Sequence, residues 1–417
     1  MSNVKNIVKN ICINAKKASN NQLAIDIRNK ILLDVSRSIK LHSQEIIEAN
    51  NLDLEYAHKN NLGSAKIDRL TLNSARIDAI ANSLIEISNL EDPLGKILYE
   101  TKRDNGLHIK RVSTPIGVIL AIFESRPNVA IDIAALCFKS GNAVILRSGS
   151  DCMNSAKTLI KIFKQSLEKF SLDQNMVSII SDSHRDYVKY LLKMDDFIDV
   201  VVPRGGKSLI KAVMKSSKIP VFKHLEGNCH TYIHEDADIE KSRKISVNAK
   251  LRRVGICGAT ESLIIDKKIA KNILPLLAHD FYVNGCEMRG DKHSIKIDSR
   301  IKLAKKSDYY TEYLDKIISI KIVENIDQAI LHINNFSSSH TESIISENME
   351  AVNKFFSKIN SAIVMHNAST QFADGGEFGL GAEVGISTGK LHARGPVGLE
   401  QLTTYKYLVD ANCALRK

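Results

Sequence analysis

The chain has 417 residues, of which 44% are hydrophobic and 25% are charged, and its formal net charge is +11. This length predicts two or three domains with the composition of an ordinary globular protein, and no run approaches the roughly 20 apolar residues of a membrane span. The positive charge is spread along the chain without a basic block or a basic–aromatic module, which argues against nucleic acid and favours an anionic substrate or cofactor.

The cysteines point to a reducing compartment. The seven are widely scattered, odd in number and without C-x-x-C spacing, which argues against a disulfide framework or a zinc ribbon. The first segment, "MSNVKNIVKNICINAKK", carries Lys and Asn through its apolar positions and lacks the apolar core of a signal peptide. We therefore expect a cytoplasmic protein with reduced, mostly buried thiols and no metal.

The first half of the chain changes from helices to alternating elements. Residues 1 to about 95 show apolar residues at helical period, and Asn105-Gly106 between two extended runs predicts a β-hairpin over 98–115. Such a polar hairpin either packs against another subunit or lies on the surface. Short apolar runs then alternate with helical stretches, which predicts a parallel sheet covered on both faces. The predicted strands are 117–123, 142–146, 176–180 and 197–202.

A second alternating block predicts a second α/β domain. Its predicted strands are 261–266, 317–323, 341–346 and 361–367, and Cys257 precedes the first of them. From about residue 368 the chain is Gly-rich and is expected to form a loop, and loops of this length are usually functional.

Cys257, in "VNAKLRRVGICGATES", is the candidate nucleophile. The cations Lys250, Arg252 and Arg253 precede it and would lower the pKa of its thiol, and its flanking glycines would let backbone N–H groups approach a reacting carbonyl. Acyl transfer to sulfur needs both features. The spacing alone leaves open that Cys257 is a buried structural thiol.

Cys229, in "HLEGNCHTY", is a rival. It follows a predicted strand and has His224 and His230 nearby, so a Cys/His protease or a metal site is an alternative. Adjacency in sequence says little about geometry, and no third ligand has metal-site spacing.

Two strand ends are suited to phosphate. "VVVPRGGKS" places a glycine turn between a strand and a helix, although it is neither a Walker loop nor G-x-G-x-x-G. Arg147, in "LRSGSD", ends another strand, where an arginine suits a phosphate. An ordinary turn and a surface arginine are the alternatives.

Five segments together carry a family resemblance: "ESRPNV", "LEGNCH", "NAKLRRVGICGA", "DGGEFGLGAEVGIST" and "KLHARGPVGLEQLTTYK". They resemble the signature segments of the gamma-glutamyl phosphate reductases, a branch of the aldehyde dehydrogenase superfamily, and the likeness runs from about residue 10 to the end. It implies an aldehyde-dehydrogenase-like α/β fold with a Rossmann-type cofactor domain, an α/β catalytic domain and a small β-hairpin oligomerisation element. The implied segments are 1–97 and 116–228 for NADPH binding, 98–115 with about 395–417 for oligomerisation, 229–367 for catalysis with Cys257, and 368–394 as a Gly-rich active-site loop.

The resemblance also implies residue roles. Cys257 matches the catalytic cysteine, Asn128 the oxyanion-hole asparagine, and Glu226 the superfamily's acid in an altered motif, so that Glu226 is assigned only weakly to catalysis. The implied NADPH-binding residues are Arg147, Ser148, Pro203, Arg204, Gly205, Gly206 and Glu312. The implied substrate-binding residues are Asn248, Lys250, Arg252, Arg253, Glu377 (or Asp374), His392 and Arg394.

The activity implied by the resemblance is the NADPH-dependent reduction of L-glutamyl 5-phosphate to L-glutamate 5-semialdehyde and phosphate, through a cysteine thioester. This is the second step of proline biosynthesis from glutamate. A homo-oligomer is also implied, and contact with glutamate 5-kinase is left open. The alternatives are an aldehyde dehydrogenase of another acyl class and a non-catalytic basic binding protein on the same fold.

Overall fold

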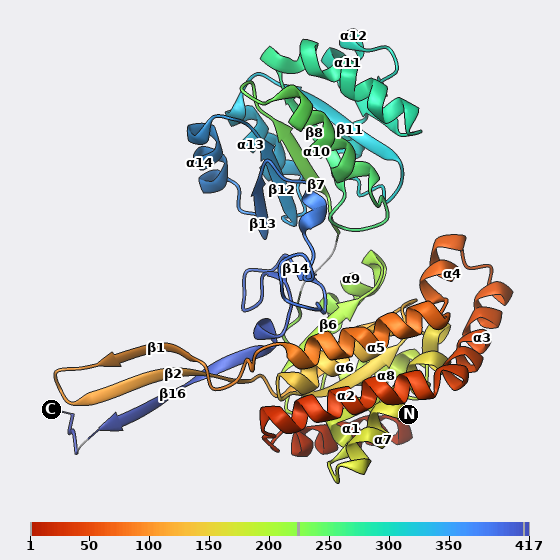
Figure 1. The fold of residues 1–417 in the computed structure, drawn as a ribbon, viewed down its shortest axis with the longest axis vertical. Helices are drawn as coiled ribbons and strands as arrows, with labels where there is room; N and C mark the ends of the chain where they lie inside the picture. Colours follow the sequence, from red (N-terminus) through yellow and green to blue (C-terminus); the bar gives the residue numbers. More distant parts are fainter. Residues whose placement is uncertain (1, 223–225, 412, 417) are drawn as a thin grey trace. The chain divides into compact units, whose positions relative to one another are not determined.

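The computed structural model describes residues 2–222, 226–411 and 413–416. The chain divides into two compact units, drawn in Figure 1. Unit 1 consists of residues 1–224, 379–385 and 397–417, and unit 2 consists of residues 225–378 and 386–396. The Gly-rich segment 368–394 therefore contributes to both units. The functional labels expected for the segments stay predictions.

Unit 1 begins with helices, as the apolar periodicity predicts. They are α1 (Ser2–Ala18), α2 (Ile25–Leu41), α3 (Ser43–Lys59), α4 (Ser64–Leu70) and α5 (Ser74–Asn89). Ile31, Val35 and Ile39 of α2 are fully buried, and α2 packs lengthwise on α5. The helical period thus places one apolar face of α2 in the interior.

A four-stranded parallel sheet forms the centre of unit 1, in the order β5-β4-β3-β6. Its strands are β3 (Val118–Phe123), β4 (Ala143–Ser148), β5 (Val177–Ile179) and β6 (Val200–Arg204). The helices between and after them are α6 (Asn128–Lys139), α7 (Met153–Lys169), α8 (Arg185–Leu191) and α9 (Lys207–Ser216), with 3₁₀ turns η1 (Ser150–Cys152) and η2 (Gln174–Met176). Every residue of β3 and β4 is buried, as expected for parallel strands covered on both faces.

The strand order reverses at β3, which pairs with β4 on one side and with β6 on the other. Phe123, the last residue of β3, lies in register with both Ser148 and Arg204. The carboxyl ends of these strands therefore meet at one edge of the sheet, which is where open α/β sheets bind ligands.

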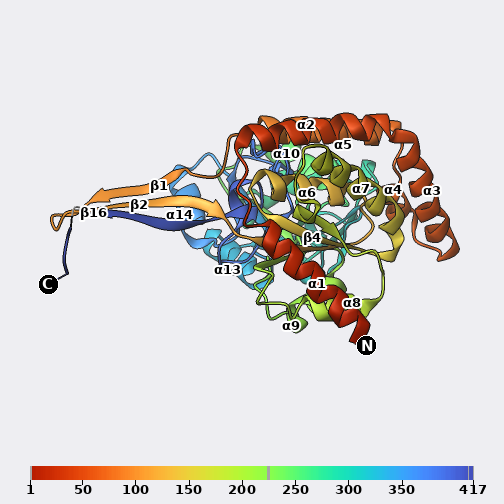
Figure 2. The same ribbon diagram turned by 90° about the horizontal axis from the view of Figure 1, so that it is seen from below.

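An antiparallel sheet of order β1-β2-β16 extends from unit 1 as a long ribbon (Figure 2). Its strands are β1 (Ile97–Lys102), β2 (Leu107–Pro115) and β16 (Thr403–Ala411). The predicted hairpin around Asn105 is confirmed as β1 and β2. The expectation that the tail is a loop is wrong over residues 403–411, which pair with β2 along the whole strand. Most of β16 is exposed, so no alternation of apolar and polar residues marked it in the sequence.

Unit 2 contains a seven-stranded parallel sheet of order β10-β9-β11-β8-β7-β12-β13. Its strands are β7 (Cys229–Ile233), β8 (Thr260–Asp266), β9 (Glu287–Gly290), β10 (Lys302–Leu303), β11 (Ile317–Val323), β12 (Thr341–Ile345) and β13 (Ile363–His366). The predicted strands of the second block are confirmed as β8, β11, β12 and β13. However, β7 comes earlier, so Cys257 does not precede the first strand of this unit, and Cys229 begins a strand rather than following one.

Helices cover both faces of this sheet. They are α10 (Ile239–Leu251), α11 (Lys267–Val283), α12 (Lys292–Ile297), α13 (Ile326–Phe336) and α14 (Met349–Lys358). Successive residues of β8 alternate between two apolar clusters: Leu263 and Ile265 join α11, whereas Ile264 joins α13 and α14. The remaining short elements are η3 (Lys306–Tyr310), η4 (Thr370–Phe372), β14 (Ile386–Ser387), β15 (Gly395–Pro396) and η5 (Glu400–Leu402). Among the described residues, no helix has the length and apolarity to cross a bilayer.

Candidate active site

Cys257 lies in the turn that connects α10 to β8, and its side chain is partly exposed. The other cysteines of the chain are buried, apart from Cys413 near the C-terminal end. Burial raises the pKa of the thiols of Cys12 and Cys286 to about 12 and that of Cys229 well above its ordinary value. A thiol that stays protonated is a poor nucleophile, so Cys257 is the favoured cysteine of unit 2.

The backbone of Cys257 is held closely by residues 227–229. A Cβ atom on Gly227 would lie 1.9 Å from the carbonyl oxygen of Cys257, so only glycine fits there. Cys229 Sγ donates to the same carbonyl oxygen over 3.1 Å. The turn that carries the candidate nucleophile is therefore fixed by direct contact with the start of β7.

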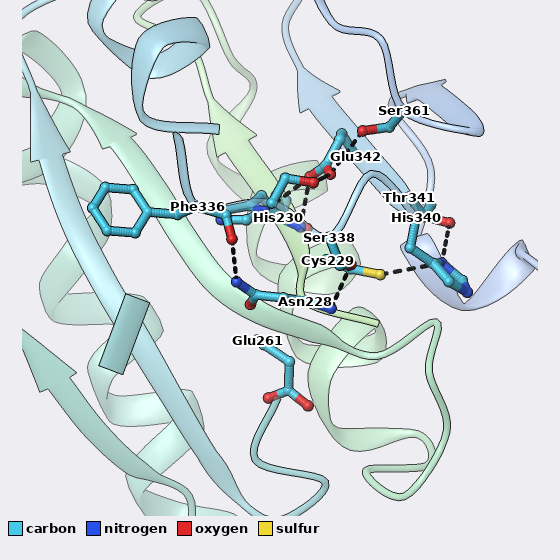
Figure 3. A network of polar contacts seen from close by, with 12 residues as sticks. Asn228, Cys229, His230, Glu261, Phe336, Ser338, His340, Thr341, Glu342 and Ser361 are labelled. Carbon is cyan, nitrogen blue, oxygen red and sulfur yellow. Dashed lines mark hydrogen bonds and ion pairs between the residues drawn. The ribbon is translucent and has the colours of Figure 1, made fainter. Parts of the chain in front are cut away.

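Cys229 itself is built into the interior (Figure 3). Its Sγ lies 3.5 Å from His340 Nδ1 as well as near Cys257. His230 is fully buried, and both its backbone N–H and its Nδ1 lie within 3.0 Å of Glu342 Oε2. The Cys229–His230 pair considered from the sequence is thus not formed, because adjacent residues of a strand point to opposite faces. His224 lies outside the described residues.

The segment that contains Glu226 is anchored by its neighbours. Gly227 donates its backbone N–H to Glu312 Oε1 at 2.8 Å, and Asn228 donates its own N–H to Ser338 Oγ at 2.9 Å. The Asn228 side-chain amide donates to the carbonyl oxygen of Phe336 (Figure 3) and to that of Tyr309, each over 2.8 Å. Glu226 is partly buried, and the structure brings Glu312 and the 226–229 segment together beside Cys257.

The basic residues before Cys257 have different environments. Lys250 is fully buried and forms an ion pair with Glu261, whose carboxyl pKa burial raises to about 7. Its ammonium group is therefore committed to the interior, contrary to the expectation that it binds substrate. Arg252 and Arg253 are exposed.

Gln371 orients the end of α10. Its side-chain amide donates to the carbonyl oxygens of Asn248 (3.1 Å) and Ala249 (2.9 Å), and its Oε1 accepts from Arg252 Nε at 3.1 Å. Asn248 is exposed, and η4 thereby holds the Arg252 guanidinium.

The other expected substrate residues lie on the Gly-rich stretch. Glu377 lines a cavity of about 590 Å³ beside β13, together with Phe372 and Phe378. Arg394 donates from Nη1 to the Asn360 side chain at 2.9 Å, in the turn that precedes β13. His392 is exposed, as is the alternative residue Asp374. Their expected roles stay predictions.

In unit 1, Arg147 is an expected cofactor residue that keeps one hydrogen-bonding group unused. It is 8% exposed, and its Nη2 donates to the Ser183 carbonyl at 2.6 Å. Its Nε is buried without a partner in the described part of the chain. By contrast, Ser148 is fully buried, and its hydroxyl donates to Met153 Sδ at 3.3 Å in the interior.

The glycine turn after β6 opens a helix. Pro203 and Arg204 end β6, and Gly206 is the N-cap of α9 without a side-chain cap. A Cβ atom on Gly205 would lie 2.8 Å from Glu124 Oε2, so the turn packs tightly on the end of β3. Free N–H groups at a helix start bind phosphate, and the cofactor roles expected for this turn and for Arg147 stay predictions.

Asn128 begins α6, and its side-chain amide donates to Asp132 Oδ2 at 3.0 Å within the same helix. Burial raises the pKa of Asp132 to about 6. The oxyanion-hole role expected for Asn128 stays a prediction.

Residues 3–283, more than half of the chain, match the family model described as "Aldehyde dehydrogenase family". The chain belongs to the aldehyde dehydrogenase family. As a member of this family it is an oxidoreductase that uses a nicotinamide cofactor, and the predicted fold class is confirmed.

Full-length relatives support this membership. A protein of Brucella suis biovar 1 named gamma-glutamyl phosphate reductase is 50% identical over 93% of this chain and 93% of its own length. The crystal structure of gamma-glutamyl phosphate reductase from Thermotoga maritima has a TM-score of 0.96 at 38% identity, covering 98% of this chain and all of that one. An acetylating aldehyde dehydrogenase from Geobacillus thermoglucosidasius has a TM-score of 0.70 at 17% identity, covering 100% of this chain and 98% of its own, and shares the fold.

Sequence reasoning missed the residues that hold the candidate nucleophile in place. Gly227 and Gln371 contact the turn of Cys257 or the helix before it from distant parts of the chain, and Glu261, in the strand after the turn, pairs with Lys250. The glycine of "LEGNCH" was the one signal available, since a glycine inside a tight segment often marks a close backbone approach. Nothing local distinguishes Glu261 or Gln371 from other polar residues.

Proposed function

We propose that this aldehyde dehydrogenase family member reduces L-glutamyl 5-phosphate to L-glutamate 5-semialdehyde and phosphate, with NADPH, through a thioester on Cys257. The observation that carries the proposal is the 50% identity, over 93% of both chains, with a protein named gamma-glutamyl phosphate reductase. The partly exposed thiol of Cys257 in a glycine-bounded turn supports the same chemistry. The reaction would be the second step of proline biosynthesis from glutamate.

In the proposed mechanism, the thiolate of Cys257 attacks the acyl carbon and inorganic phosphate leaves. Backbone N–H groups of the turn stabilise the oxyanion, and the exposed cations Arg252 and Arg253 neutralise the phosphate. Bound NADPH supplies the hydride that reduces the thioester. Collapse of the resulting hemithioacetal releases the aldehyde and regenerates the thiolate. Glu226 has only a small role, because phosphate takes the place of the water that a hydrolytic enzyme must activate.

Two groups of residues are proposed to hold the cofactor. In unit 1 they are the turn Pro203–Gly206 and Arg147, whose unpaired Nε suits the 2′-phosphate that distinguishes NADPH from NADH. In unit 2, Glu312 is proposed to hold the nicotinamide ribose. Its carboxylate already accepts from Gly227 beside Cys257.

Replacing Arg147 with alanine is expected to weaken NADPH binding about 10- to 100-fold, the loss of one charge-assisted hydrogen-bonding group. NADH binding should change far less, because NADH has no 2′-phosphate. Titrations that follow the fluorescence of each reduced cofactor measure both dissociation constants. An equal loss for both cofactors would remove Arg147 from recognition of the 2′-phosphate.

The reverse reaction tests the substrate class. Reduction of NADP⁺ by glutamate 5-semialdehyde is expected to require inorganic phosphate, because phosphate must release the acyl group from Cys257. Rapid reduction without phosphate, yielding glutamate, would instead indicate a hydrolytic aldehyde dehydrogenase. Absence of turnover with phosphate, in a preparation that binds RNA, would favour the non-catalytic alternative.

We also propose a cytoplasmic homo-oligomer. The support is the β1-β2-β16 sheet, which exposes Tyr405, Tyr407 and Val409 by half or more of their surface. Exposed apolar side chains on one sheet mark a protein contact. Sedimentation velocity of the full chain measures its oligomeric state. Contact with glutamate 5-kinase stays open.

A further inference from the structure

Residues 312–314 form a short segment tied to the surroundings of Cys257 at each position. Glu312 accepts from the Gly227 N–H at 2.8 Å, and Leu314 donates its N–H to Glu261 Oε1 at 3.2 Å. The ring of Tyr313 lies between two cations, 5.9 Å from Lys250 Nζ and 5.3 Å from the guanidinium carbon of Arg289. Three consecutive residues are thus held by four different partners.

The Lys250–Glu261 pair lies at the centre of these contacts. Both side chains are fully buried, with Lys250 in the last turn of α10 and Glu261 as the second residue of β8. These elements enclose the turn of Cys257. A buried ion pair gives up the hydration of both charges and is often no more stable than an apolar pair, so stability alone explains it poorly.

Leu314 shows what the pair does to the backbone. Its φ is +53°, a left-handed conformation that leucine rarely adopts. Such a conformation persists when neighbouring contacts hold it. The hydrogen bond from Leu314 to Glu261 is one such contact, and it fixes the direction in which the chain leaves Glu312.

We propose that the Lys250–Glu261 pair is a positioning device for the Glu312 carboxylate, and through it for the nicotinamide end of the cofactor. Lys250 fixes one carboxylate oxygen of Glu261, and the other oxygen fixes Leu314. Glu312, two residues earlier, is thereby held against Gly227 beside the nucleophile. The inference rests on the proposed function, in which Glu312 holds the ribose.

Three variants test the device. Glu261→Gln keeps an oxygen for Leu314 and loses the charge, Glu261→Leu loses both, and Lys250→Met leaves Glu261 without its partner. The matched control is Glu342→Gln, which alters another fully buried carboxylate, the second residue of β12, whose partners include His230 and Ser361. For each variant the readouts are the NADPH dissociation constant by fluorescence, the KM for NADP⁺ and kcat with semialdehyde and phosphate, and Tm.

Glu261→Leu and Lys250→Met are expected to raise the NADPH dissociation constant and the KM for NADP⁺ about tenfold, which corresponds to one lost hydrogen bond of ordinary strength. The two cofactor constants of Glu261→Gln should lie between those of these variants and those of the wild type. The control should lower Tm while leaving both cofactor constants within about twofold, inside the range of ordinary indirect effects.

Unchanged cofactor constants in folded Glu261→Leu or Lys250→Met, with a fall in Tm like that of the control, would overturn the proposal and leave the pair a structural one. If Glu261→Leu does not fold, the cofactor constants and Tm of Glu261→Gln and Lys250→Met, compared with those of the control, test the proposal. The proposed function fails separately, if the wild-type chain shows no phosphate-dependent turnover. The NADPH dissociation constants still test the pair in that case.

Discussion

Replacing Cys257 with alanine is expected to lower turnover about 10³-fold or more, because the proposed acyl-enzyme forms on its sulfur. The substitution removes one partly exposed sulfur atom. In the described part of the chain that sulfur makes no hydrogen bond. NADPH binding should therefore be kept. Steady-state rates with semialdehyde and phosphate, together with an NADPH fluorescence titration, measure the two properties.

The control for this variant is Cys286→Ala. Cys286 is buried in the apolar cluster beneath α11, and burial raises the pKa of its thiol to about 12. Its loss should reduce Tm by removing packing while turnover is kept. Iodoacetamide should label Cys257 much faster than Cys286 in the folded protein. Full turnover by Cys257→Ala would exclude the thioester mechanism.

Replacing Gly227 with alanine is expected to cost about 100-fold in kcat, the typical effect of misplacing a reacting group by about 1 Å. The added methyl group would lie 1.9 Å from the Cys257 carbonyl oxygen and 2.6 Å from its Cα. These are backbone atoms, so the strain cannot be relieved by turning a flexible side chain. Either the turn of Cys257 or the segment that binds Glu312 must move.

The control is Gly63→Ala, at the start of α4, where an added methyl group meets nothing within 4 Å. This variant should match the wild type in kcat and Tm. The rate at which iodoacetamide alkylates Cys257 should also change in Gly227→Ala. This rate reports on the turn independently of the cofactor. A Gly227→Ala enzyme with normal kcat would show that the contact is relieved without cost to catalysis.

The pattern of buried strands and helices was readable because it is local. The run that became β3 is apolar throughout, and those that became β4 and β11 are mostly apolar, as is typical of strands covered on both faces. The strand β16 was not readable, since its residues are mostly exposed and its partner β2 lies far away in the sequence. The start of β7 at Cys229 was missed because "CHTYI" mixes polar and apolar residues, although the fold buries them all.

The candidate site was predictable in its chemistry and less so in its contacts. Cys257 stood out by its flanking glycines and cations, and Arg147 by its place at a strand end. The sequence equally predicted that Lys250 binds a substrate anion. Lys250 is instead buried in an ion pair with Glu261, which follows the turn in the sequence. A charge near a nucleophile in sequence does not reveal on which side of the backbone its side chain lies. That depends on the packing of α10 against β8.

The discontinuity of unit 1 has a consequence for its biosynthesis. Its last strand, β16, is translated after all of unit 2, and the Asn142 side chain, which donates to the Leu402 carbonyl at 2.8 Å, must also wait for that part of the chain. Until then, β2 keeps one row of backbone N–H and C=O groups open on the nascent polypeptide. Open strand edges recruit other strands. A polypeptide released before Thr403 has been added is therefore expected to aggregate, even though every element of the Cys257 turn has already been made.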